Sequence, residues 1–304
     1  MSQCPITYEI CSPNKYSAAG LKKLRRNLTT VELMDETIIH GHPATNFEIN
    51  WPGPWAFGDI PSGTQQMEIR LKKSRFILLP PAKPILQTSE NIDLSTRLAQ
   101  ICGIKTTFHG MLYNKDQTLS YFTEIPRNKE QNKPFSLTKS SEALKSLKKP
   151  IQPNSVEGLA DLIDTYCTFP VVEKYRLFQR ILFSWIIGYE TQSWKDFFLL
   201  KEPLKTTIAP PFFFANSVLL YGRQDSEMGL SLHGKKTMLS IEDITNLLGH
   251  EILQLPEDAV AYVLQHFKTS YSSIRNLTLN SFLSEDLKEY YLDVLVSRFS
   301  RLKL

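Results

Sequence analysis

The chain has 304 residues, which is enough for one large domain or two medium domains with a sizeable buried core. Its hydrophobic fraction of 42% and its charged fraction of 22% exclude a disordered or fibrous chain. The net charge of +4 is mildly basic, and the densest basic runs, 21–26 and 144–149, are typical of solvated helix faces. Specific nucleic-acid binding is therefore not predicted.

The cysteine pattern and the apolar runs predict a compartment. The four cysteines lack the spacing of a metal site or of a paired disulfide framework, and no apolar leader follows the start. The most apolar helical run, 175–188, is too short to span a bilayer and carries Arg176 and Arg180. We therefore expect a cytoplasmic protein without a membrane contact, with export as an effector as the alternative.

The first half of the chain is rich in predicted strands. Alternating apolar residues bounded by Pro, Gly or charged residues indicate hairpins, and apolar residues at helical spacing indicate helices. In chain order we predict a helix at 16–26, a long loop at 46–63, a hairpin at 66–71 and 75–79, a helix at 88–102 capped by Ser89 and ended by Gly103, and a hairpin at 109–113 and 119–125.

The second half is predicted to be helical. A segment rich in Ser, Lys and charge, 126–153, interrupts the apolar pattern. Helical periodicity then predicts helices at 156–166, 171–187, 240–249 with a capping box of Ser240 and Asp243, 256–267 and 284–299. We therefore predict an α+β fold with a β-rich N-terminal lobe, 1–150, and a helical C-terminal lobe, 151–304. This is the outline of a two-lobed protein kinase, with nucleotide expected between the lobes.

Several segments in order carry a resemblance to a known family. They are "CPITYE", "YSAAGLKKL", "PSGTQQMEIRL", "RFILLPP", "SENIDLSTRLAQICGI", "RLFQRILFSWIIG", "IAPPFFFANSVLL" and "MGLSLHGKKTMLSIEDI". Together they span nearly the whole chain. The sequence resembles the HipA-like serine/threonine kinases of bacterial toxin–antitoxin systems, particularly the short HipT form. The resemblance implies a kinase fold with ATP and Mg²⁺ bound by an active member.

The resemblance places the phosphate-binding groups at positions that are apolar here. Leu79 stands where the family has a catalytic lysine, and Ile92 stands where it has a glutamate. In an active kinase such a lysine–glutamate pair positions the α- and β-phosphates. Two aliphatic side chains can neither pair by charge nor hydrogen-bond a phosphate, so this function is predicted to be lost.

The catalytic loop and the metal-binding segment are altered in the same way. Thr191 stands at the position of the family's catalytic aspartate, and a threonine hydroxyl cannot accept the substrate proton at neutral pH. Phe213 stands at the position of the metal-binding aspartate, and a phenyl ring offers Mg²⁺ no oxygen ligand. Loss of base, metal ligand and lysine removes most of the terms that phosphoryl transfer requires.

Some polar residues remain in the matching segments. Lys195 matches the family's catalytic-loop lysine, and Asp196 occupies the position of its metal-binding asparagine, although a surface turn would explain both. Ser62 matches the autophosphorylated loop serine of the family, but without a base it is read as a loop residue or a target of another kinase. Glu190 and Asp225 are candidates for relocated metal ligands.

The leading hypothesis is a HipA-like pseudokinase that acts by protein binding. The resemblance implies a HipB-like antitoxin, a small HipS-like subunit or a kinase substrate as the partner, and no cofactor is expected. The alternative is a divergent serine/threonine kinase toxin or nucleotidyl transferase that uses ATP and Mg²⁺. It requires Glu190, Asp196 or Asp225 to converge in the cleft.

Overall fold

The computed structural model describes residues 3–13, 15–28, 48–50, 67–71, 74–81, 87–113, 118–128, 133–134, 136–147, 150–223 and 225–303. For residues 25–28, 48–50, 67–71, 74–75, 127–128, 133–134 and 136, only the backbone is described. The predicted loop residues 51–63, Ser62 among them, lie outside the described residues.

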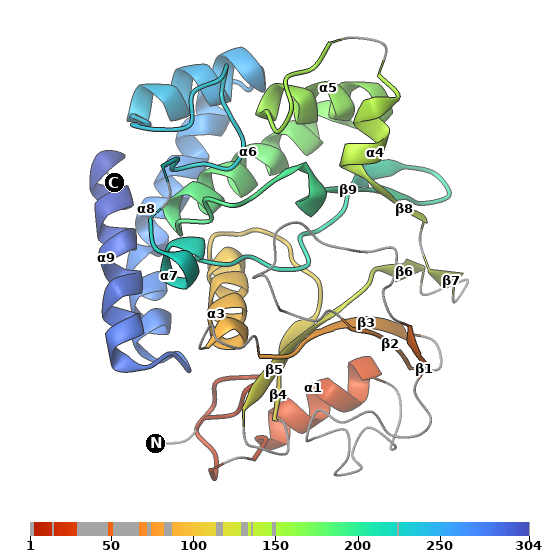
Figure 1. The fold of residues 1–304 in the computed structure, drawn as a ribbon, viewed down its shortest axis with the longest axis vertical. Helices are drawn as coiled ribbons and strands as arrows, with labels where there is room; N and C mark the ends of the chain where they lie inside the picture. Colours follow the sequence, from red (N-terminus) through yellow and green to blue (C-terminus); the bar gives the residue numbers. More distant parts are fainter. Residues whose placement is uncertain are drawn as a thin grey trace.

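The N-terminal lobe contains a five-stranded antiparallel sheet in the order β1-β2-β3-β5-β4 (Figure 1). Its strands are β1 (Glu48–Asn50), β2 (Met67–Leu71), β3 (Ser74–Leu79), β4 (His109–Tyr113) and β5 (Leu119–Glu124). Both predicted hairpins are therefore confirmed. The loop predicted at 46–63 is wrong at 48–50, because this segment pairs with β2 as an edge strand.

Strand β3 is central in the sheet and is buried on both faces. Phe76 and Leu78 pack with Leu24 of α1 (Ala18–Leu28), whereas Ile77 and Leu79 belong to the main core. This division follows from the two-residue period of a strand, which sends successive side chains to opposite faces. Helix α1 covers one face of the sheet and α3 lies on the other (Figure 1).

Helix α3 (Thr88–Ile101) confirms the helix predicted after the first hairpin. The predicted cap is wrong, because the N-cap is Gln87, which has a left-handed backbone and no side-chain capping bond. Ser89 instead lies in the first turn, and its hydroxyl donates to the Leu79 carbonyl at 3.4 Å. Gly103, with φ of 76°, ends the helix as predicted, since glycine tolerates this conformation.

The segment between the lobes contains short strands. They are β6 (Arg127–Asn128), β7 (Lys133–Pro134) and β8 (Ser136–Lys139), followed by helix α4 (Ser140–Lys145). Strand β8 pairs with β9 (Phe198–Lys201), which also pairs with β10 (Thr206–Ile208). These residues precede the lobe boundary predicted at residue 150, yet they pack with later elements, and the boundary stays a prediction.

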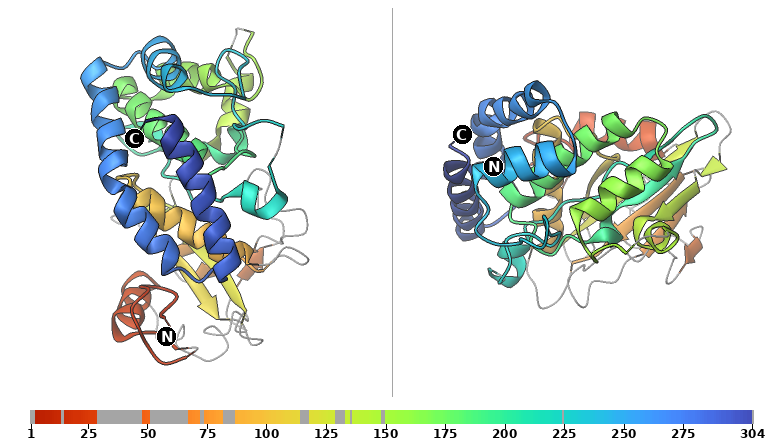
Figure 2. Two further views of the ribbon diagram at one scale, coloured as in Figure 1. Left: turned by 90° about the vertical axis from the view of Figure 1, so that its left-hand side faces the viewer. Right: turned by 90° about the horizontal axis from the view of Figure 1, so that it is seen from above.

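The C-terminal lobe is built mainly from helices around one apolar core (Figures 1 and 2). They are α5 (Val156–Tyr166), α6 (Pro170–Ile186), the 3-10 turn η2 (Trp194–Asp196), α7 (Ser217–Tyr221), the π-helical η3 (Asp243–Ile252), α8 (Glu257–Leu279) and α9 (Glu285–Arg301). The predicted helices are confirmed, although α8 continues beyond residue 267. Ser240 and Asp243 form the expected reciprocal capping bonds.

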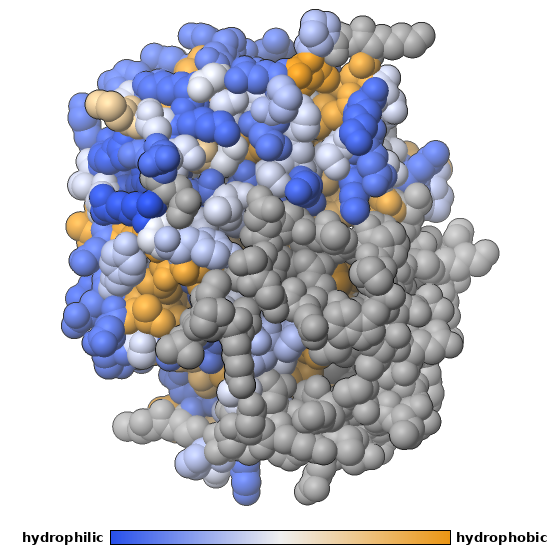
Figure 3. Space-filling view, in the orientation of Figure 1, coloured by the Kyte–Doolittle hydropathy of each residue, from blue (hydrophilic) through white to orange (hydrophobic). Residues whose placement is uncertain are grey.

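The long helices α8 and α9 tie the lobes together. In the left view of Figure 2, α8 runs along one edge of the molecule and reaches the level of α3, and α9 lies beside it. Helix α3 packs on α8, and Ser95 of α3 shares a 2.8 Å hydrogen bond with Tyr291 of α9. In the view of Figure 3 the described surface of the helical half is largely hydrophilic. No helix among the described residues combines the length and apolar character of a membrane span.

Helix α3 is joined to the segment 212–216 by buried hydrogen bonds. The Asn91 amide donates to the Asn216 carbonyl at 3.0 Å and accepts from the Asn216 N–H at 2.8 Å. The Phe214 N–H donates to Thr96 Oγ1 at 3.0 Å, and the Tyr121 hydroxyl of β5 donates to the Phe212 carbonyl at 2.8 Å. Side chains of the N-terminal lobe thus hold the segment 212–216 through hydrogen bonds to its backbone.

Replacing Asn91 should weaken this connection. Asn91→Leu leaves a buried N–H and a buried carbonyl of Asn216 without the amide, and we expect about 2 kcal/mol or more of lost unfolding free energy. The exposed Gln100→Ala, on the same helix, should change stability by less than about 0.5 kcal/mol. Urea unfolding of both variants measures the difference. Equal stability of the two would refute a structural role for the Asn91 amide.

Candidate functional site: a kinase cleft with apolar replacements

The loop after α6, residues 188–196, is the segment that the resemblance matches to a catalytic loop (the catalytic-loop counterpart), and it is tied to α7. The Ser217 hydroxyl donates to the Gly188 carbonyl at 3.0 Å and accepts from the Glu190 N–H at 2.8 Å. The Ser217 N–H also donates to the Gly188 carbonyl at 3.0 Å. Gly188 has φ of 74°, which favours glycine at this turn. The path of the loop is therefore set by α7, which follows the metal-binding counterpart segment.

The second half of the loop is fixed by its own cap and by α5. The Asp196 carboxylate accepts from the Ser193 N–H at 2.7 Å, which completes a capping box on η2. The Trp194 indole donates to the Ser155 carbonyl at 2.7 Å, at the start of α5. Asp196 is buried, whereas Lys195 is exposed. The Asp196 carboxylate thus shapes the turn that contains it.

A close backbone approach also holds the middle of this loop. A Cβ atom added to Gly229 would overlap the Gln192 carbonyl oxygen. Only glycine allows this contact, because a backbone oxygen has no room to rotate away. Thr191, the residue at the base position, precedes Gln192 in this fixed turn and is partly exposed. A neutral hydroxyl therefore occupies the place that the family resemblance gives to a carboxylate.

The positions matching the lysine and the glutamate lie within the main apolar core. Leu79 ends β3 and Ile92 lies in the first turns of α3, and each side chain is 1% exposed. Both belong to the same buried cluster, and the Ser89 hydroxyl links the helix to the Leu79 carbonyl. Buried aliphatic side chains therefore stand at both positions to which the resemblance assigns the charge pair of an active kinase.

The position matching the metal-binding aspartate is also apolar. Phe213 is 8% exposed and lies with its ring centroid 6.4 Å from that of Tyr189 in the catalytic-loop counterpart. Its neighbour Phe214 packs edge-on against Phe183 of α6 at 4.9 Å. Burial raises the pKa of Tyr121, so its hydroxyl stays protonated and donates to the Phe212 carbonyl. The segment is held by aromatic packing and backbone hydrogen bonds.

Glu190, a candidate relocated ligand, takes part in a buried ionic network. Its carboxylate accepts from Arg298 of α9 at 2.9 Å, and Arg298 also lies 3.0 Å from the Glu227 carboxylate. Arg301 pairs with Glu227 at 2.6 Å, and both guanidinium groups lie over the Trp185 ring at 5.0 and 5.2 Å. Burial lowers the pKa of Arg298, although Glu227 and Glu190 oppose that effect by attraction.

The candidate acidic residues do not all meet. Glu190 and Asp225 line one pocket of 200 Å³ together with Glu227 and three arginines, Arg223, Arg298 and Arg301, but Asp196 is not among its lining residues. Within the described ranges, no group of three or more His, Cys, Asp or Glu side chains is placed to hold a metal ion. Glu190 and Glu227 of this pocket are therefore paired with guanidinium groups.

Sequence reasoning missed several residues that organise the site. Asn91 and Asn216 carry no motif that would reveal their pairing across 125 residues. Arg298 likewise lies on the amphipathic helix α9, and nothing in its sequence pattern indicates a buried ion pair. Arg180 gave a signal, because a charged residue within the apolar run 175–188 needs a buried partner. The structure supplies backbone carbonyls for it, at Asp196 and Ala209.

The molecule has a two-lobed kinase-like fold. The N-terminal lobe contains a small β-sheet, α3 hydrogen-bonds the backbone of the opposite lobe, and the loop 188–196 follows the buried helix α6. The fold is that of HipA-like kinases. The structure is similar to that of HipA from the Shewanella oneidensis MR-1 toxin–antitoxin system, which was solved with HipB and operator DNA. The TM-score is 0.64 at 13% sequence identity, and the match covers 86% of this chain and 73% of the HipA chain.

A second similar structure is the proinflammatory kinase CtkA of Helicobacter pylori. Its TM-score is 0.59 at 16% identity, with 84% of this chain and 93% of that chain covered. No protein-family model matches the chain, and no curated protein matches it in sequence. The predicted resemblance and the predicted α+β kinase-like fold are thus confirmed at the level of the fold.

Restoring the missing charges singly should destabilise the protein. Leu79→Lys or Ile92→Glu would place one charge in the apolar cluster, at a cost of about 3 kcal/mol or more. If the side chains face one another, the double variant should recover about 1 kcal/mol or more by coupling. Denaturant unfolding of all four proteins gives the cycle.

The size-matched control for this cycle is Leu79→Met, which should cost less than about 1.5 kcal/mol because it preserves volume and apolar character. Additive losses in the double variant would show that positions 79 and 92 do not face each other. A charged single variant as stable as the control would contradict the apolar environment of the cluster.

The Glu190–Arg298 pair should contribute to stability rather than to ligand binding. Arg298→Met takes the guanidinium from a buried carboxylate, and we expect a loss of about 3 kcal/mol. Adding Glu190→Gln should recover part of that loss, since the amide carries no charge to be buried. Thermal and urea unfolding measure both. If the double variant recovers no stability, the loss in Arg298→Met would come from the contacts of Arg298 with Glu227 and Trp185 instead.

Proposed function

We propose that this chain is a catalytically inactive protein with the HipA-like kinase fold, and that it acts by binding another protein. The observation that carries the proposal is the burial of Leu79, Ile92 and Phe213 in one apolar cluster. These are the positions that the resemblance assigns to the phosphate lysine, its glutamate and the metal aspartate. A cluster of hydrocarbon side chains supplies neither oxygen ligands for Mg²⁺ nor charge for a triphosphate.

The remaining polar residues of the catalytic-loop counterpart support the same proposal. Thr191 offers only a neutral hydroxyl, and a general base must accept a proton at the working pH. The Asp196 carboxylate caps its own turn, and Lys195 projects from the exposed side of that turn. The Asp196 carboxylate thus has a structural role in its own turn. No cofactor is expected, and ATP with Mg²⁺ belongs to the alternative.

The partner is proposed from the fold. HipA of Shewanella oneidensis was solved with HipB and operator DNA, so a HipB-like antitoxin is one candidate partner. A small HipS-like subunit and a substrate shared with an active kinase are the other candidates. A chain that keeps the scaffold while losing the catalytic groups could occupy such a partner without modifying it. The proposed context is a bacterial toxin–antitoxin system.

One observation bears on the alternative of a divergent kinase or nucleotidyl transferase. Glu190 and Asp225 line the same small pocket, as relocated metal ligands would. The Glu190 side chain is only 2% exposed and is paired with Arg298, so binding a cation would require breaking this ion pair. That cost favours the inactive form, because a buried carboxylate separated from its cation is expensive.

Nucleotide binding and phosphoryl transfer test the proposal directly. We expect no change in melting temperature with ATP and Mg²⁺, whereas ligand at 100 times its Kd would add roughly 2.7 kcal/mol. We also expect no transfer of radiolabel from γ-labelled ATP to the protein or to a general substrate such as casein. A HipA-type kinase treated in parallel is the positive control. Transfer that is abolished by Glu190→Gln or Asp196→Ala would overturn the inactive assignment.

A further inference from the structure

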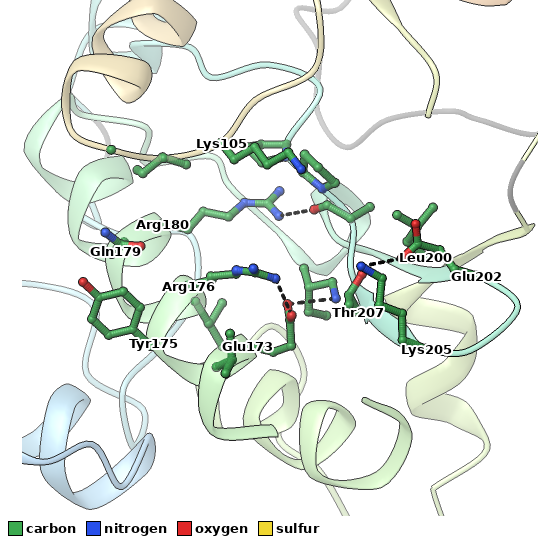
Figure 4. Close-up of a pocket in the computed structure, with 18 residues that line it drawn as sticks. Lys105, Glu173, Tyr175, Arg176, Gln179, Arg180, Leu200, Glu202, Lys205 and Thr207 are labelled. Atoms are coloured by element: carbon green, nitrogen blue, oxygen red, sulfur yellow. Dashed lines mark hydrogen bonds and ion pairs between the residues drawn. The ribbon is translucent and has the colours of Figure 1, made fainter. Parts of the chain in front are cut away.

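A second pocket lies on the C-terminal lobe, and its lining includes no residue of the loop 188–196. It has a volume of 480 Å³, a size typical of ligand pockets, and lies between α6, the β9–β10 strand pair and the segments 103–105 and 208–211. Figure 4 shows Arg176 and Arg180 extending from α6 to the same side, with Lys105 near Arg180. Lys205 and Glu202 approach from the strand pair.

The charges of this pocket do not cancel. Its lining carries four cationic side chains, Lys105, Arg176, Arg180 and Lys205, and two carboxylates, Glu173 and Glu202. The carboxylates are already engaged, since Arg176 pairs with Glu173 at 2.6 Å and Lys205 pairs with Glu202 at 2.9 Å. Within the described part of the chain, neither Lys105 nor Arg180 has a carboxylate oxygen within 4.0 Å. The pocket therefore holds an excess of positive charge.

Arg180 is the unusual member of this set because its charge is buried. It is 5% exposed, and its guanidinium donates to the carbonyls of Asp196 at 2.6 Å and Ala209 at 3.4 Å. It stacks on the Phe197 ring at 4.0 Å, and its Nε finds no acceptor among the described residues. Burial lowers the pKa of Arg180 to about 10, so it remains charged at neutral pH. Attraction from the Asp196 carboxylate opposes the effect of burial, and the unbonded Nε leaves one donor of the guanidinium for a further acceptor.

Two segments that form part of the pocket rim carry exposed apolar side chains. The segments 168–172 and 202–206 lie side by side, since the Thr168 N–H donates to the Thr206 carbonyl and the Thr206 N–H donates to Thr168 Oγ1, both at 2.9 Å. Val172, Glu202 and Lys205 of these segments line the pocket. Phe169, Val171, Val172 and Leu204 are exposed by 59%, 67%, 47% and 94%, and large apolar side chains left exposed on adjoining segments favour contact with another molecule.

We propose that this pocket and its rim bind an acidic peptide segment of a protein partner, with a carboxylate side chain directed to Lys105 and Arg180 and an apolar side chain placed on Val172 and Leu204. The inference rests on the proposed function, because it names the surface through which such a binding protein would act. A carboxylate completes the charge of the pocket, and the apolar rim suits the neighbouring side chains of a peptide.

The rim distinguishes this occupant from other anions. A nucleic acid would set charged phosphates against Phe169 and Leu204, and its affinity depends on basic residues spread along its path. A free inorganic anion would gain the charge of Lys105 and Arg180 but would leave the apolar rim uncovered. An acidic peptide with apolar neighbours is the ligand that uses both features.

The test uses the full chain and a defined probe. A fluorescein-labelled short peptide of alternating leucine and glutamate should bind, and fluorescence anisotropy should show at least about tenfold weaker binding by Lys105→Glu. Val172→Asp should weaken binding similarly, since it sets a carboxylate beside the probe. Both residues are exposed, so both variants should fold. Lys22→Glu, at an exposed position on α1, makes the same charge change outside the pocket and should bind like the original protein.

The remaining arms decide the identity of the ligand. A leucine–glutamine peptide of the same length should bind at least about tenfold more weakly, because it lacks the anion. Equal binding of that peptide, or equal loss in Lys22→Glu, would overturn the proposal. Competition by free glutamate or inorganic phosphate as strong as by the peptide would show a small-anion pocket instead, and tighter binding of a labelled oligothymidine, lost in Lys105→Glu, would show a nucleic-acid site.

The outcome is independent of the catalytic question. If radiolabel transfer were found while Lys105→Glu still abolished peptide binding, the inactive assignment would fail and the peptide site would stand. If no transfer occurred and the peptide failed to bind, the peptide site would fail and the inactive assignment would stand.

Discussion

The paired hydrogen bonds between Asn91 and Asn216 are the contact on which the arrangement of this protein depends. They join α3 of the N-terminal lobe to the segment that follows the metal-binding counterpart position. The neutral Asn91 amide bonds both the N–H and the carbonyl of Asn216, so this connection between the lobes requires neither an ion nor a nucleotide. Buried polar groups are costly when unpaired, so this exchange fixes the separation of α3 from the C-terminal lobe.

The same part of the molecule carries the positions that the resemblance assigns to phosphate and metal binding. Leu79 of β3, Ile92 of α3 and Phe213 of the segment 212–216 are buried members of the main apolar core, and Thr96 of α3 accepts from the Phe214 N–H. In an active kinase that region must stay open to phosphate and metal. Here apolar side chains occupy these positions, and buried hydrogen bonds join α3 to the segment 212–216.

Two groups of charged side chains lie outside the positions of Leu79, Ile92 and Phe213. One group surrounds Arg298, where Glu190 and Glu227 compensate the guanidinium. The other surrounds Arg180 of α6, whose guanidinium donates to the Asp196 and Ala209 carbonyls, stacks on the Phe197 ring and is attracted by the Asp196 carboxylate. The first is complete without a ligand, whereas the second leaves an excess of positive charge beside an apolar rim. Arg180 also holds the Asp196 carbonyl, so the pocket and the loop share a residue.

The sequence by itself determined the hairpins, most helices, the α+β class and the kinase-like resemblance, because alternating and helical apolar periods report which face of each element is buried. Through the resemblance it also predicted that Leu79, Ile92 and Phe213 stand at the positions of catalytic groups, and this assignment stays a prediction. Only the tertiary structure decided that Glu190 pairs with Arg298, that Asp196 caps its own turn, and that β8 joins β9. These contacts link residues that are distant in sequence or depend on backbone geometry, and neither leaves a periodic pattern in the chain.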